Sequence, residues 1–291
     1  MRDLAGRYEF SPIEGYVLTV DTVSRLKRSS GTALVSLDLG RTKCAIEVEG
    51  GRVRLPSGAE LDLSLLEEVV AEEDRAYFVY PDGRGPFEIG FFSAGRYYRL
   101  RVVAPDTAPT LEISGIHMHR IKDVTPLEDT LEKLKLARIG RKCVVLDVCT
   151  GLGYTAIYSL AMGAARVLSI EKDPNVLEIA RYNPWSRELA DPRIEVVLAD
   201  ASEYVRELPD ESFDRVVHDP PTLALAGELY GLEFYRELYR VLKRGGYLFH
   251  YTGAPGSRRG VRVQAGVARR LREAGFRVVR VIKDLGIVAY K

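Results

Sequence analysis

The stretch VVLDVCTGLGYTA, residues 144–156, decides the fold. A β-branched, apolar run ends at Asp147, glycines follow at 151 and 153, and residues with helical periodicity come next. The stretch therefore predicts a strand, a tight loop and a helix. Glycines let the backbone pass close to a ligand, and the amides of the helix's first turn face the same ligand. This arrangement is typical of a nucleotide-binding crossover.

After residue 142 the sequence alternates between strand and helix patterns. Further strands are predicted at 165–171, 194–200, 213–219 and 247–251, and helices at 154–162, 174–182 and 261–273, with one more long helix before residue 247. Only three residues separate the last two strand patterns, 276–282 and 286–290, so they predict an antiparallel hairpin. The whole predicts an α/β fold with a Rossmann-like, mostly parallel, doubly wound sheet that has an antiparallel C-terminal strand.

Residues 1–112 read as short strands broken by Gly, Pro and Asp, which predicts a small β-rich domain. GYVLTVDTV at 15–23 is expected to be a strand, and CAIEVE and RVRLP are expected to form a hairpin. One short helix is expected at 61–71, with Ser64 as its cap. The segment PDTAPT at 105–110 is typical of a connection, so the predicted domains are 1–112 and 113–291.

The charge is unevenly distributed along a chain whose formal net charge is +1. Residues 1–112 carry 14 Lys and Arg against 18 Asp and Glu, and residues 113–291 carry 28 against 23. This asymmetry permits a polyanionic partner for the C-terminal domain. Aromatic and basic residues alternate at 91–101, which predicts either a face that stacks on RNA bases or aromatics that fill a core.

Several classes of protein are excluded by composition. The three cysteines lack metal-ligand spacing, so neither a disulfide framework nor a zinc site is expected. No apolar run reaches the roughly 20 residues that span a bilayer, so no membrane partner is expected. The first residues, MRDLAGRYEF, lack a signal-peptide core, and we expect a cytoplasmic protein.

Ligands of a doubly wound sheet bind outside the carboxyl ends of its strands, so the residues there are candidates for the site. Glu171 ends the second strand, where its carboxylate can accept both hydroxyls of a ribose. Asp200 ends the third, where it can accept the exocyclic amine of an adenine. Asp219 ends the fourth, at the edge of the same cavity.

This pattern, over residues 113–291, resembles the class I methyltransferases that use S-adenosylmethionine. The rival is a dinucleotide-binding Rossmann domain, but the antiparallel end and the Asp-Pro-Pro sequence after the fourth strand argue against it. The resemblance implies S-adenosylmethionine as cofactor and implies that these residues bind it: His119, Asp147, Thr150, Gly151, Gly153, Glu171, Lys172, Asp200 and Ala201.

The sequence Asp219-Pro220-Pro221-Thr222 resembles the Asp/Asn-Pro-Pro-Tyr/Phe motif of amino-group methyltransferases. The resemblance implies that Asp219, Pro220 and Pro221 are catalytic: a carboxylate and a rigid carbonyl accept hydrogen bonds from an NH₂ group and direct its lone pair at the methyl group. Thr222 replaces the final aromatic, so another aromatic must stack on the base. The predicted substrate-binding residues are Trp185, Tyr230, Arg258 and Arg259.

The closest overall likeness is to a group of predicted archaeal methyltransferases that combine RYNPWSREL, HDPPT and LAGELYGLEFYRELYRVLKRGGYLFHYTG. This resemblance implies an S-adenosylmethionine-dependent enzyme, and we expect it to methylate a nitrogen of a base in tRNA or rRNA. RNA is therefore the expected partner. A non-catalytic RNA-binding module is a further alternative, which the intact strand-end residues disfavour.

A second enzyme class shares the fold. The segment ELYGLEFY resembles the LYxxEFY segment of spermidine synthases, which transfer an aminopropyl group from decarboxylated S-adenosylmethionine to a polyamine. Those enzymes surround their substrate with acids because a polyamine needs paired carboxylates. Asp219 and Glu228 are present here, but Pro220 and Pro221 replace the acidic loop, so aminopropyl transfer ranks second.

His117 and His119 share one face of an extended segment, a spacing that invites a metal site. No third ligand accompanies them, so no metal is expected. We expect the pair either to border the cofactor pocket or to be buried with hydrogen-bond partners.

Overall fold

A computed structural model describes residues 6–29, 31–253 and 258–291; within the last range the side chains of residues 258–261 are not described. The chain divides into two compact units. The first consists of Met1–Phe10, Thr130–Pro174 and Leu189–Lys291, and the second of Ser11–Asp129 and Asn175–Glu188. The predicted division at residues 112 and 113 stays a prediction.

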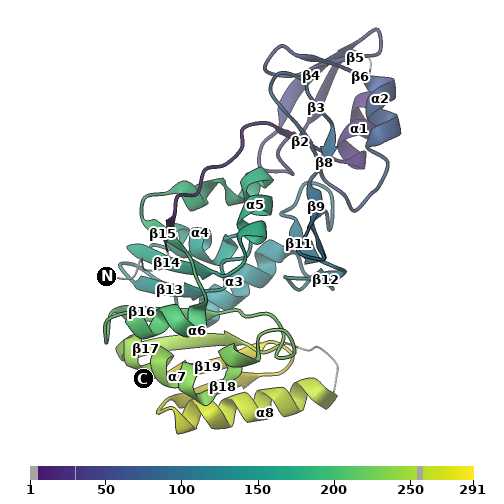
Figure 1. Cartoon of the computed structure of the whole chain (residues 1–291). Helices are drawn as coiled ribbons and strands as arrows, with labels where there is room; N and C mark the ends of the chain where they lie inside the picture. Colours follow the sequence, from purple (N-terminus) through teal and green to yellow (C-terminus); the bar gives the residue numbers. More distant parts are fainter. Residues whose placement is uncertain (1–5, 30, 254–257) are drawn as a thin grey trace. The chain divides into compact units, whose positions relative to one another are not determined.

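The first unit is built on an eight-stranded sheet (Figure 1). Its strands, in spatial order, are β1 (Arg7–Tyr8), β15 (Ile194–Leu198), β14 (Arg166–Glu171), β13 (Val144–Val148), β16 (Phe213–His218), β17 (Leu242–Tyr251), β19 (Gly286–Tyr290) and β18 (Arg277–Ile282). The strands from β15 to β17 are parallel, whereas β19 pairs antiparallel with both β17 and β18. The predicted Rossmann-like sheet with an antiparallel end is confirmed.

Helices follow the parallel strands in the order that the sequence predicts. They are α4 (Tyr154–Ala161), α5 (Pro174–Tyr182), α6 (Ala201–Tyr204), α7 (Leu232–Val241) and α8 (Arg258–Glu273), with 3-10 turns η1 (Pro184–Ala190), η2 (Val205–Glu207) and η3 (Gly227–Tyr230). Before them, α3 (Pro126–Leu136) begins with a capping box, because the Thr125 amide donates to Glu128 and the Glu128 amide donates to Thr125. Apolar side chains of the central strands and of α7 and α8 form one buried cluster.

The second unit contains three small antiparallel sheets, which confirms the predicted β-rich region. One consists of β3 (Gly31–Val35), β4 (Cys44–Glu49), β5 (Arg52–Arg54) and β6 (Glu60–Asp62); another of β2 (Tyr16–Leu18), β7 (Tyr77–Val79) and β8 (Phe87–Glu88); the third of β9 (Gly90–Ser93), β10 (Arg96–Arg101), β11 (Thr110–Ile113) and β12 (Ile116–His117). The β4 and β5 hairpin is the one expected from the sequence.

Three local predictions were wrong. Residues 15–23 are not one strand, because β2 ends at Leu18 and Thr19 caps a helix, α1 (Val20–Lys27), by accepting from the Thr22 amide. The cap of α2 (Leu63–Val69) is Asp62 and not Ser64, since Asp62 accepts from the amides at 64 and 65. Strand β17 begins at Leu242, where the sequence predicts helix.

The first strand was also missed. Arg7 and Tyr8 pair antiparallel with Val197 and Val196 and so extend the sheet of the first unit beyond β15. Two residues carry no periodicity that could identify a strand, so only the tertiary pairing defines it.

Candidate active site

Four acidic residues meet at the carboxyl edge of the first unit's sheet. Asp147 lies in β13, Glu171 ends β14, Asp200 lies two residues beyond β15, and Asp219 follows β16 directly. Burial and then the charges of these four acids raise the pKa of the Cys149 thiol well above its ordinary value. All four acids therefore lie within electrostatic range of Cys149, at the edge of the sheet where the carboxyl ends of parallel strands meet.

The glycine loop begins this region. Both glycines have left-handed backbones, with φ of 55° at Gly151 and 81° at Gly153. A Cβ at Gly151 would have no atom within 4 Å, whereas a Cβ at Gly153 would lie 2.5 Å from the Leu189 side chain. Gly151 therefore faces open space, and Gly153 is also needed for packing and for the start of α4. Their predicted contacts with a cofactor stay predictions.

Asp147 is a fully buried carboxyl group at this loop. Its Oδ2 accepts a hydrogen bond of 2.7 Å from Ser169, whose hydroxyl also lies 2.7 Å from that of Thr150. Burial raises the pKa of Asp147 to about 7, although the hydroxyls of Ser169 and Thr155 act in the opposite direction. Within the described part of the chain its Oδ1 atom has no hydrogen-bond partner. This region therefore holds an acid that nearby hydroxyls compensate only in part.

Glu171 holds the loop in place through backbone amides. Its Oε2 accepts from the Gly151 amide at 3.0 Å, and its Oε1 accepts from the amides of Lys172 and Asp173 at 2.9 and 3.0 Å. A carboxylate has about four acceptor positions, so these bonds leave about one for a ligand. Burial raises the pKa of Glu171. This geometry allows Glu171 to accept a hydrogen bond from one ribose hydroxyl. To bind both hydroxyls, as predicted, one of its acceptor positions would have to accept two hydrogen bonds.

Asp200 caps helix α6, accepting from the Ser202 amide at 2.9 Å, and receives a 2.5 Å bond from the Lys172 ammonium. Burial alone would raise the pKa of Asp200, but the bonds from Lys172 and Ser202 outweigh it and hold the pKa below its usual value. Ala201, the next residue, is buried as the first residue of α6. Lys172 therefore balances the acid that is predicted to bind adenine.

Asp219 has a partner that the sequence did not reveal. Its Oδ2 accepts a 2.7 Å bond from the ammonium of Lys133, which lies on α3 and is 1% exposed. The same ammonium lies 4.2 Å from the centre of the Tyr251 ring. In the sequence Lys133 sits beside the apolar stripe of α3 like any solvated lysine, so no signal identified it.

Aromatic and imidazole side chains contact the Pro-Pro loop after β16 and the segment that follows it. The Tyr230 hydroxyl donates to the Pro221 carbonyl at 2.9 Å, and burial raises the pKa of Tyr230, which keeps it protonated. Nε2 of His218 lies 2.9 Å from the Leu229 carbonyl, and the centres of the His218 and His250 rings lie 4.2 Å apart with the ring planes tilted by 38°. Tyr230 is itself buried and fixes the loop, and its predicted contact with a substrate base stays a prediction.

Two predicted site residues belong to the second unit. His119 Nδ1 lies 2.9 Å from the Thr110 hydroxyl, and Trp185 donates from Nε1 to the Leu39 carbonyl at 3.0 Å. The Arg41 guanidinium lies over the Trp185 ring. Both side chains thus have structural partners within their own unit, and their predicted roles toward cofactor and substrate stay predictions.

Arg258 and Arg259 form the first turn of α8, and their side chains lie outside the described part of the structure. In the described residues we find no cluster of three or more His, Cys, Asp or Glu that could hold a metal ion. Nor is any helix among them long and apolar enough to cross a bilayer.

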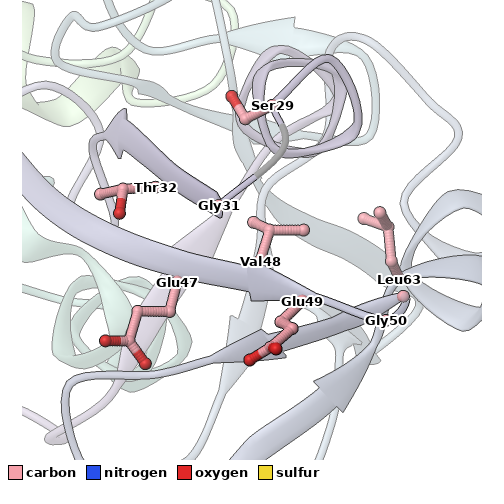
Figure 2. A pocket seen from close by; sticks show the side chains of 9 residues that line it. Ser29, Gly31, Thr32, Glu47, Val48, Glu49, Gly50 and Leu63 are labelled. Carbon is pink, nitrogen blue, oxygen red and sulfur yellow. The ribbon is translucent and has the colours of Figure 1, made fainter.

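A hollow of about 680 Å³ lies in the second unit, beside the β4 and β5 hairpin (Figure 2). Thr32, Glu47 and Glu49 line it together with the glycines of the turn. None of the predicted site residues is part of its lining. It therefore adds nothing to the site in the first unit.

The chain is similar to several known proteins. Residues 145–246 match the family model described as a methyltransferase domain. Over 156 residues, 52% of each chain, the protein is 31% identical to the polyamine aminopropyltransferase of Thermotoga maritima. The crystal structure of spermidine synthase from the same organism has a TM-score of 0.54 at 23% identity, covering 69% of this chain and 70% of that one, which shows a common fold.

The predicted class I, S-adenosylmethionine-dependent methyltransferase fold and the class of cofactor that goes with it are confirmed. A further relative is similar well beyond the methyltransferase domain. The protein is 44% identical over 272 residues to the uncharacterized protein MJ1233 of Methanocaldococcus jannaschii, covering 91% of this chain and 92% of that one. The chain therefore belongs to the same family as MJ1233, with a methyltransferase domain at residues 145–246.

Proposed function

We propose that the protein methylates a nitrogen atom, and that this nitrogen is the exocyclic amine of a base in tRNA or rRNA. The observation that carries the proposal is the Asp219-Pro220-Pro221 loop at the carboxyl end of β16, which Lys133 and Tyr230 hold from two sides. The loop contains a carboxylate and a proline carbonyl, the kinds of acceptor that an NH₂ group needs.

The residues present fit the cofactor. S-adenosylmethionine supplies a methyl group on a positively charged sulfonium, and the site combines open space at Gly151 with the acids Asp147 and Glu171. Glu171 and Asp200 would hold its ribose and adenine. Acids around a cationic ligand lower its free energy in the site, and the buried Oδ1 of Asp147 is an acceptor without a hydrogen-bond partner among the described residues.

Asp219 and the Pro220 carbonyl orient the acceptor nitrogen so that its lone pair points at the methyl carbon. With the cofactor bound, transfer would form the N–C bond as the S–C bond breaks with its electron pair on sulfur, and one N–H proton would leave to solvent. Acceptors already fixed in place require no reorganisation during the step, so positioning contributes most of the rate. The pathway needs no covalent enzyme intermediate.

RNA as the substrate is supported by charge. Residues 113–291 carry five more basic than acidic residues, and Arg262 on α8 is exposed. Phosphate contacts from Arg258, Arg259 and Arg262 would position the RNA without reading its sequence.

Aminopropyl transfer to a polyamine is the second candidate, because the Thermotoga maritima aminopropyltransferase is 31% identical over half of the chain. A polyamine is a polycation and requires acids that no other cation balances. Lys133 already balances Asp219, and Lys172 balances Asp200. This pairing favours a neutral acceptor.

The test is transfer of labelled methyl from S-adenosylmethionine into unmodified total RNA, run beside a polyamine pool supplied with decarboxylated cofactor. We expect label in RNA, and digestion to nucleosides then identifies the base. Product in the polyamine arm alone would overturn the proposal in favour of aminopropyl transfer. Binding of RNA with no transfer in either arm would support the alternative that the protein is a non-catalytic RNA-binding module.

A further inference from the structure

We propose that Lys133 is the specificity-determining residue of this site: its buried ammonium neutralises Asp219 and so excludes cationic amines while admitting a neutral nitrogen. The inference rests on the proposed function, and it names the charge that the acceptor must have. Asp219 is the acid that would contact the acceptor, so its charge balance decides which acceptor binds.

Lys133 is held in a place where an unpaired charge would be costly. Its side chain is 1% exposed, and that of Asp219 is 14% exposed. A buried ammonium persists only when paired, and here it has a carboxylate at 2.7 Å and an aromatic face at 4.2 Å. Both partners favour the charged form of the lysine.

The ring of Tyr251, the aromatic partner of Lys133, lies against the backbone two residues further along the chain. A Cβ at Gly253 would lie 2.2 Å from the Tyr251 hydroxyl, so a glycine leaves room for that ring. Tyr251 ends β17 and Lys133 lies on α3, so two regular elements place the ammonium against Asp219. A rigid pair of this kind keeps its geometry when an acceptor enters.

The consequence follows from Coulomb's law. A cationic amine that approaches Asp219 meets the ammonium of Lys133 a few ångströms away, and repulsion between two like charges is strong where water is excluded. A neutral base amine meets no such repulsion and still finds a carboxylate that accepts its N–H. Lys133 therefore separates the two candidate chemistries that this fold supports.

The experiment compares Lys133→Met with Lys135→Met, a control that removes an exposed lysine two residues along the same helix. Putrescine is the probe, titrated by calorimetry into the full-length protein with S-adenosylhomocysteine bound. We expect Lys133→Met to bind putrescine at least about tenfold more tightly than the unaltered protein, because Asp219 is no longer balanced. The control should not change.

Lys133→Arg keeps the charge and should keep putrescine binding weak, which separates charge from shape. If Lys133→Met does not fold, Asp219→Asn gives the reciprocal test: it removes the negative charge beside the Lys133 ammonium, so putrescine should bind still more weakly than to the unaltered protein. Unchanged putrescine affinity in a folded, cofactor-binding Lys133→Met variant would overturn the inference.

The two proposals fail in different ways. If the unaltered protein methylates RNA and Lys133→Met binds putrescine no better, only the role of Lys133 is wrong. If the unaltered protein transfers no methyl to RNA and binds putrescine tightly with Lys133 in place, both are wrong.

Discussion

Asp147 in the first unit and Glu112 in the second are both buried carboxyl groups, yet their pKa values move in opposite directions. Burial raises the pKa of Asp147 to about 7. Burial also acts to raise the pKa of Glu112, but hydrogen bonds from Arg99 and Arg101 outweigh it and lower the pKa to about 2. Those bonds measure 2.8 and 2.7 Å, whereas the bond from Ser169 to Asp147 comes from a neutral hydroxyl.

The difference in charge compensation distinguishes a structural ion cluster in the second unit from a candidate ligand site in the first. In the second unit arginines from β10 satisfy Glu112 and also contact Asp74, so the charges stabilise the sheet. At the carboxyl edge of the first unit's sheet, Asp147 has hydroxyls, Glu171 has backbone amides, and Asp200 and Asp219 have lysine partners. Acids without full compensation cost stability and are available to a cationic ligand.

The largest effect is expected at Asp219. Asp219→Ala removes the carboxylate that orients the acceptor, and we expect methyl transfer to fall by about 10³-fold with cofactor binding largely unchanged. Single-turnover transfer and calorimetry with S-adenosylhomocysteine measure the two quantities. Because Ala removes the carboxylate beside the buried Lys133 ammonium, the double variant Lys133→Met/Asp219→Ala is the folding control. Loss of cofactor binding in both variants would refute the division of roles.

The next effect concerns stability and not activity. Glu112→Ala leaves Arg99 and Arg101 with less compensation, and we expect the free energy of unfolding to fall by about 3 kcal/mol. Urea denaturation measures it, and Glu73→Ala, at an exposed position, is the control. A change no larger than that of the control would mean that the ion cluster does not stabilise the second unit.

Asp147 should make stability depend on pH. Between its usual value of 3.8 and its folded value of about 7, the unfolded chain has released the proton while the folded protein keeps it. The free energy of unfolding therefore falls as pH rises through this window, by up to about 4 kcal/mol.

Asp147→Asn abolishes that titration. The variant should gain stability relative to the unaltered protein as pH rises from 4 to 7, and the difference should be constant above pH 8. Urea unfolding of both proteins at several pH values measures the difference between their free energies of unfolding. The buried histidines titrate in both proteins, so their contribution cancels in this difference. A difference that is independent of pH would contradict the partial compensation of Asp147.

The smallest effect is expected at Asp200, where Lys172 already balances the charge. Asp200→Ala should weaken S-adenosylhomocysteine binding by about tenfold, the cost of roughly one hydrogen bond to a charged group. Glu203→Ala, an exposed change on the same helix, serves as the control. Asp200→Asn keeps the helix cap and shows whether the loss comes from the cap or from the ligand contact.

The parts of the fold that the sequence predicted are those with local signals. The run from Val144 to Asp147 and the glycines after it define strand, loop and helix within a few residues, and the hairpin of β18 and β19 has a three-residue connection. Helix α1 was missed because VLTVDTV is rich in the β-branched residues typical of strands, and burial of Val23 and Leu26 decides otherwise. Tertiary packing overrides local preference there.

The acidic residues of the candidate site could be predicted from the sequence, but the lysine that contacts Asp219 could not. Parallel topology alone places Glu171, Asp200 and Asp219 at one edge, so spacing in the sequence was sufficient. Lys133 reaches Asp219 from a helix that precedes the sheet, and no pattern in a sequence reports such a contact. The pKa of Asp147 likewise depends on burial, which appears only in the folded chain.

The pairing of β1 with β15 has a consequence for the order in which the protein folds. Arg7 and Tyr8 are synthesised before their partners Val197 and Val196, and the whole second unit and two central strands are made in between. Contacts between such distant parts of a chain close large loops and slow folding. During synthesis, the edge of the sheet at β15 therefore closes only when a much earlier segment of the chain pairs with it.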